Sequence, residues 1–191
     1  MPRTMQYLAR ATLLTALAMS GCKTDPAPPH LVSALNISGP QDITLDGVVF
    51  PARIDNFRRV SFSQYNRAAT DISFGYNSSS GIAATLYVYP SRKLNLAVEF
   101  SDRQNEIESA HPQAQLLSSS DTTVSPLKLS ALEADYTFVG RHAGSEIMLH
   151  SRLLVARRGS QFIEYRFSWP AQQPTAAAEV QHFVENFALA L

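Results

Sequence analysis

Alternating apolar and polar residues predict β-strands over much of the chain beyond residue 41. Three segments, 59–65, 70–76 and 82–89, alternate with a period of two. Successive side chains of a strand point to opposite faces, so this period is typical of strands with one buried face. The segments follow one another closely and predict an antiparallel meander, in which Val60 and Phe62 share one face of the first strand.

Two turn signals occur in this part of the chain, one before the meander and one within it. Asp46-Gly47 separates the short apolar segments 43–45 and 48–50, and glycine tolerates the positive φ of a two-residue hairpin turn. The serine-rich segment 77–81 predicts the loop between the second and third meander strands. Each signal therefore predicts a hairpin.

Three further strands are predicted near the C-terminus, over 133–141, 147–157 and 161–169, with a three-residue turn at 158–160. Pairing across that turn predicts one apolar face made of Leu149, Leu153, Val155, Ile163, Tyr165, Phe167 and Trp169. Arg152, Glu164 and Arg166 are expected together on the opposite face. A cross-strand ion pair at the surface explains them and contributes about 0.5 kcal/mol.

Two segments predict helices. The segment 94–100 alternates like a strand, but 93–111 also carries a helical stripe, is rich in helix formers and ends before Pro112, which favours a helix. His111 would then lie at the helix C-terminus, where a partly positive imidazole is favourable. From Pro174 a second helix has one apolar stripe, made of Val180, Phe183, Val184, Phe187 and Leu191.

These elements predict a single α+β domain over residues 41–191. Its antiparallel sheet is expected to have about six strands, flanked by the middle helix and the amphipathic C-terminal helix. The apolar stripe of the C-terminal helix must pack against this sheet. We expect the domain by itself to be soluble and monomeric.

The N-terminal segment has the layout of a secretory signal. Arg3 and Arg10 precede an apolar run over 11–19, which is too short to span a bilayer and leads into small residues. We therefore expect residues 1–21 to be a signal peptide, with cleavage between Gly21 and Cys22. An ordinary signal peptide that leaves a free thiol is the alternative.

The tetrapeptide Met19-Ser20-Gly21-Cys22 resembles the lipobox of bacterial lipoproteins, although leucine is more usual than methionine at the first position. The resemblance implies lipidation of Cys22, the only cysteine, and a membrane anchor of several acyl chains. Lys23 is not the aspartate that retains such proteins at the inner membrane. The outer membrane, facing the periplasm, is therefore expected, with residues 22–40 as a proline-containing tether.

Charge and composition exclude some functions. The chain has 16 basic and 16 acidic side chains, and loss of Arg3 and Arg10 with the signal leaves 14 basic ones. No basic block with interleaved aromatic residues follows, so we expect no nucleic-acid partner. The pairs Arg58-Arg59 and Arg157-Arg158 are interpreted as solvated turn or strand-end residues.

The sequence shows no motif for catalysis or cofactor binding. The glycines at 75 and 81 do not have the spacing of a nucleophile elbow or a phosphate loop. His142 and His150 flank a predicted turn, but without a carboxylate cluster they make a weak metal site. Glu106 and Glu108 point apart on a helix and are interpreted as solvated charges. We expect no cofactor, no metal and no enzymatic activity.

The hairpin Leu153–Pro170, followed by an amphipathic helix, resembles the end of PsbP-like and DcrB-like domains. The segment Ala83–Pro90, followed by a helix, fits the same order, so the resemblance covers roughly residues 45 to 190. It implies an antiparallel sheet flanked by helices and a non-catalytic domain of the kind found in extrinsic subunits, partner-binding proteins and envelope lipoproteins.

We therefore expect a non-catalytic envelope lipoprotein that acts as a structural or partner-binding module. Tyr87, Tyr89 and Phe162 are expected to point outward, and aromatic side chains dominate protein interfaces. The alternative is a carrier or sensor that binds a small apolar ligand between sheet and helix.

Overall fold

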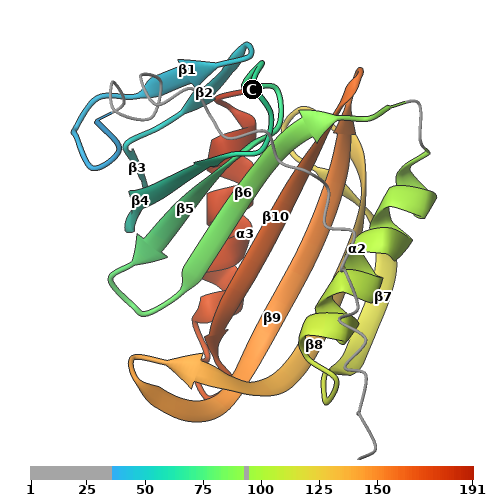
Figure 1. Ribbon diagram of the computed structural model, residues 1–191. Coiled ribbons are helices and arrows are strands. Elements are labelled where there is room, and N and C mark those ends of the chain that lie inside the picture. The colour runs from blue at the N-terminus through green and yellow to red at the C-terminus, as the bar shows by residue number, and fades with distance from the viewer. Residues whose placement is uncertain (1–35, 93–94) are drawn as a thin grey trace, which may run out of the picture.

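The computed structural model describes residues 36–92 and 95–191 and shows an α+β fold around one large antiparallel sheet (Figure 1). The sheet has eight strands in the order β3-β4-β5-β6-β10-β9-β8-β7. In that order the strands are β3 (Arg53–Ile54), β4 (Phe57–Gln64), β5 (Ile72–Ser78), β6 (Ala83–Pro90), β10 (Gln161–Pro170), β9 (Ser145–Arg158), β8 (Leu129–His142) and β7 (Gln115–Val124). The predicted class is confirmed.

The two strands that the sequence did not predict are the edge strands β3 and β7. β3 is only two residues long. β7 is ten residues long, but its residues 115–121 are exposed on both faces, and serine and threonine fill most of its second half. A strand without a buried face has no apolar period, which is the signal that the prediction used.

A separate hairpin precedes the sheet. β1 (Ile43–Leu45) and β2 (Val48–Phe50) pair around Asp46 and Gly47, both of which have positive φ, as the turn signal predicted. The turn predicted between the second and third meander strands is also present, between β5 and β6.

Both predicted helices form, on opposite faces of the sheet (Figure 1). α2 (Leu96–Ala110) starts after Asn95, whose side chain accepts a hydrogen bond from the backbone N–H of Val98 at 2.8 Å. It packs on β8 and β9. α3 (Ala176–Ala188) contacts β10 and also the edge strands β3 and β7, so the sheet curves around it.

The sheet therefore separates two apolar cores. The larger one lies on the side of α3, whose Val180, Phe183, Val184 and Phe187 are buried as predicted. The smaller one lies under α2 and includes Phe100, Ile107, Tyr136, Phe138, Leu153 and Phe162. No helix within the described part of the chain is long and apolar enough to cross a membrane.

The register of β9 against β10 differs from the prediction. Arg158 pairs with Gln161, so the turn has two residues, Gly159 and Ser160, instead of three. A shift of one residue moves every side chain of a strand to the other face. Ile163, Tyr165, Phe167 and Trp169 consequently lie with Leu154 and Ala156 on the α3 side, whereas Leu149, Leu153 and Val155 lie on the α2 side.

The face predicted for β4 is also wrong in part. The register shifts between Arg59 and Ser61, which marks a β-bulge. Val60 is 43% exposed, whereas Arg59 is buried and Phe62 packs against the larger core. A bulge inserts one residue and so interrupts the alternation of faces on which the prediction depended.

Arg59 was interpreted as a solvated residue, but it is only 1% exposed. Its guanidinium donates hydrogen bonds to the backbone carbonyls of Ile37 (2.9 Å), Gln41 (2.8 Å) and Phe50. It also lies 5.8 Å from the ring centroid of Phe74. Arg59 therefore connects the segment that precedes the sheet to β4, while its neighbour Arg58 is exposed.

Candidate functional site

The candidate site is a cleft between α2 and the part of the sheet that α2 leaves uncovered. α2 packs on β8 and β9, and no described helix covers the same face over β5 and β6 (Figure 1). The cleft has a volume of about 420 Å³, and β6, β10 and α2 supply most of its lining. This volume is within the range of small-molecule sites.

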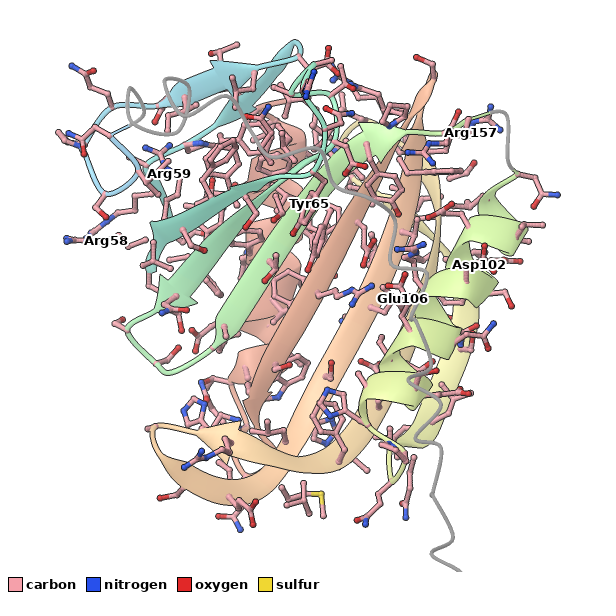
Figure 2. All side chains as sticks on the ribbon, in the orientation of Figure 1. Arg58, Arg59, Tyr65, Asp102, Glu106 and Arg157 are labelled. Carbon is pink, nitrogen blue, oxygen red and sulfur yellow. The ribbon has the colours of Figure 1, made fainter. Side chains whose placement is uncertain are left out.

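One face of α2 forms the charged wall of the cleft. Glu99, Asp102, Arg103 and Glu106 are spaced i, i+3, i+4 and i+7, which places them on the same side of the helix. Figure 2 shows Asp102 and Glu106 on α2 and Tyr65 over the sheet. The helical spacing of these four charged residues is visible in the sequence and would have predicted this charged wall.

One ion pair connects that wall to the sheet, and the others lie within α2 or within β10. Arg166 on β10 binds Glu106 at 2.6 Å and also pairs with Glu164 on its own strand. Arg103 binds Glu106 at 2.6 Å and Glu99 at 3.1 Å. Glu106 was interpreted as a solvated charge; its side chain is 47% exposed, and it also bridges two arginines.

Glu164 is the most buried acid of the cleft, with 1% of its surface exposed. The hydroxyl of Tyr89 donates a hydrogen bond to its carboxylate at 3.0 Å. Burial raises the pKa of Glu164 above its usual range, and the adjacent Arg166 opposes this shift. The carboxylate is thus held in place by an arginine on one side and a phenol on the other.

Three tyrosines supply the aromatic surface of the cleft. Tyr65 and Tyr87 stack with ring centroids 6.3 Å apart. The guanidinium of Arg166 lies 5.4 Å from the ring centroid of Tyr87, and that of Arg103 lies 6.0 Å from that of Tyr89. Cations over tyrosine faces at these distances are attracted by the ring quadrupole.

Two predictions about this face of the sheet are wrong. Arg152 does not join Glu164 and Arg166, because the changed register puts it on the other face, where it forms a bidentate pair with Asp135 at 2.9 and 3.0 Å. Phe162 does not point outward, since it is fully buried under α2. Tyr87 and Tyr89 are half-buried and line the cleft.

His142 and His150, the two histidines that flank the β8–β9 turn, do not approach one another. His142 ends β8 opposite Ser145, whereas His150 pairs with Thr137, five positions away and so roughly 16 Å along the strand. His150 instead stacks on Trp169, with ring centroids 5.7 Å apart. Among the described residues, no group of three or more histidine, cysteine or acidic side chains is arranged to hold a metal.

His111 follows α2 as its C-terminal cap, as predicted, and its ring stacks on Phe138 at a centroid distance of 3.9 Å. Gly21 and Cys22, the predicted cleavage and lipidation residues, lie outside the described residues.

The sequence analysis did not identify Tyr65, Asp71 and Arg92 as residues that line the cleft. They come from strand ends and connections, which carry no periodic signal.

The arrangement provides groups for binding a polar or charged ligand. The aromatic rings offer flat apolar faces, while five carboxylates and three arginines offer charge-assisted hydrogen bonds. The volume of the cleft and its mixture of rings and charges distinguish it from an ordinary exposed ion-pair network.

No protein-family model matches the chain, and no curated protein matches it significantly. Among solved structures, PA94 from Pseudomonas aeruginosa, a protein of unknown function, matches with a TM-score of 0.40 and 14% identity, over 74% of this chain and 93% of that one. CyanoP, the cyanobacterial PsbP of Synechocystis sp. PCC 6803, matches with a TM-score of 0.49 and 11% identity, over 78% of this chain and 89% of that one. A PsbP-like protein is thus among the structural matches, and no function is carried over from either.

Proposed function

We propose that the protein is a lipid-anchored module of the bacterial envelope that binds a ligand or partner in the cleft between α2 and the sheet. The observation that carries this proposal is the cleft itself, with its stacked tyrosines and its arginine–carboxylate pairs. The proposed lipid anchor is inferred from Cys22, which follows the apolar run 11–19 as in bacterial lipoproteins. Outer-membrane attachment facing the periplasm, without nucleic acid as partner, is part of the proposal.

A binding role is favoured over a catalytic one by the ion pairs of the three glutamates in the cleft. Glu99, Glu106 and Glu164 are each paired with an arginine. A general acid or base needs to exchange a proton with a substrate, and a carboxylate held by guanidinium groups is poorly suited to that role. Such pairs instead orient side chains for recognition.

The alternative of a carrier for a small apolar ligand is less well supported. The spaces directly beneath α2 and α3 are filled by the two apolar cores. The cleft beside α2 is lined by charged groups and tyrosines, and an apolar ligand would desolvate those charges without offering them hydrogen bonds.

Photo-cross-linking in the native envelope tests the proposal. A benzoylphenylalanine residue replaces Tyr65 in the cleft, and a control protein carries it in place of Ser119, which is exposed on β7. We expect the cleft position to give one discrete adduct, detected by intact mass, that the control position does not give. Absence of an adduct from the cleft, or the same adduct from both positions, would overturn the proposal.

A further inference from the structure

The acids of the cleft outnumber its arginines. Five carboxylates, on Asp71, Glu99, Asp102, Glu106 and Glu164, face three guanidinium groups. If all are ionised, the cleft carries a formal charge of −2. The cleft therefore favours positive charge on whatever it binds.

Two of the five acids lie outside the ion pairs of the cleft. Arg103 and Arg166 bind the three glutamates, whereas Asp71 and Asp102 form no ion pair with any described residue. Burial raises the pKa of Asp71, and Arg92 and Arg103 oppose this shift without contacting the carboxylate as an ion pair. A cation placed beside Asp71 would compensate its desolvation.

The protein's own arginines show how the cleft accommodates a cation. Arg166 lies over the ring of Tyr87 while it binds Glu106, and Arg103 lies over the ring of Tyr89 while it binds the same carboxylate. Each cation thus has an aromatic face and an acid as partners. Tyr65, Asp71 and Asp102 supply the same two kinds of group, and among the described residues no cation forms an ion pair with either aspartate.

We infer that the cleft binds an organic cation, a primary amine or guanidinium group, between Asp71, Asp102 and the ring of Tyr65. This inference rests on the proposed binding function and names the chemistry of its ligand. The group could belong to a free polyamine or to a lysine or arginine side chain of a partner, since both present the same cation. A cleft of about 420 Å³ has room for such a group with its alkyl chain.

Calorimetric titration of the full-length protein in detergent tests the inference. The ligands are spermidine, the tripeptide Gly-Lys-Gly, and glutarate as an anion of similar size. We expect at least one of the two amines to bind more tightly than glutarate, and its binding to weaken in high salt, where charges are screened over a shorter distance. The stronger of the two amines identifies the source of the cation.

Asp71→Asn and Asp102→Asn remove the two carboxylates that form no ion pair with a described residue, and they leave side-chain size almost unchanged. Each should weaken binding of the amine about fivefold, as expected for a partly exposed ion pair. Asp121→Asn, an exposed acid on β7 outside the cleft, is the matched control and should change nothing. Circular dichroism confirms that the variants are folded.

Three results would overturn the inference: no measurable binding of either amine, binding of glutarate with equal affinity, or equal affinities for wild type and both cleft variants. These results are separable from failure of the proposed function. A discrete cross-link at position 65 that persists unchanged in the Asp71→Asn, Asp102→Asn double variant would leave the binding function standing while rejecting a cationic ligand.

Discussion

Arg59 is a buried cation whose three described hydrogen bonds all go to main-chain carbonyls. Its guanidinium holds Ile37, Gln41 and Phe50 against β4, although these residues are 9 to 22 positions away in sequence. A buried charge is tolerated when its donors are satisfied, and here the peptide carbonyls replace water. The residue therefore contributes to stability through the segment it binds.

Replacing Arg59 with methionine should lower the free energy of unfolding by about 1.5 to 3 kcal/mol, because the buried carbonyls lose a charged donor. Denaturant unfolding of the purified protein measures this change. Arg58→Met, at the exposed neighbouring position, is the control and should alter stability by no more than about 0.5 kcal/mol. Equal effects of the two substitutions would show that Arg59 does not hold the segment.

Glu164 should make stability depend on pH. Burial raises the pKa of its carboxyl in the folded protein above the ordinary value of 4.5. Between the ordinary and the raised pKa, the folded protein retains a proton that the unfolded chain has released. The free energy of unfolding therefore falls as pH rises through this window and becomes level above it.

Glu164→Gln removes this titration, so its stability should fall less than that of the wild type over this window. Urea unfolding from about pH 4 to about pH 8 compares the two proteins. Glu108→Gln, an exposed position on α2, should follow the wild type throughout. A wild-type profile parallel to that of Glu164→Gln would contradict the raised pKa.

At the scale of elements, α3 acts as the centre around which the sheet curves. The ring of Phe183 meets those of Phe57, Tyr76 and Phe167 at centroid distances of 4.8, 5.3 and 5.4 Å. These partners come from β4, β5 and β10, so one side chain joins three strands. The apolar stripe of α3 is thus core and not an exposed recognition surface.

Phe183→Ala should cost about 3 to 5 kcal/mol, because truncating a buried phenylalanine removes its burial and leaves a cavity. Glu185→Ala, on the more exposed side of α3, should cost no more than about 0.5 kcal/mol. The midpoint of denaturant unfolding measures both. An unchanged midpoint for Phe183→Ala would mean that the packing of α3 is not as described.

At the scale of the whole molecule, the folded domain and the N-terminal segment are expected to have separate roles, binding and attachment. Mass spectrometry of membrane-extracted protein should find Cys22 at the mature N-terminus, carrying a diacylglyceryl group and a third acyl chain. Cys22→Ala should abolish membrane fractionation, since an unlipidated chain has no anchor. A Cys22→Ala protein that is processed normally and stays with membranes would reject lipidation.

A fragment of residues 41–191 should fold alone as a soluble monomer with a cooperative thermal transition. It retains both apolar cores and two of the three carbonyls that Arg59 binds, those of Gln41 and Phe50. Only the Ile37 carbonyl is lost. Differential scanning calorimetry and analytical ultracentrifugation check this, and an insoluble or non-cooperative fragment would place the domain boundary before residue 41.

The sequence by itself determined where most elements lie. Period-two alternation located β5, β6, β8, β9 and β10, and the 3.6-residue period located α3, because burial of one face imposes these periods on any single element. Turn chemistry placed the hairpin at Asp46 and Gly47. All of these signals are local, since each depends on residues within one element or one turn.

Only the tertiary structure decided which elements meet and which faces they share. The two-residue turn at Gly159 and Ser160 changed the register of β9 and β10, and so separated Arg152 from Glu164. The cleft depends on contacts between α2 and β10, such as Arg166 with Glu106, 60 residues apart. Local periodicity carries no information about such pairing, because the partner of a charge or the register of a strand is set by a segment elsewhere in the chain.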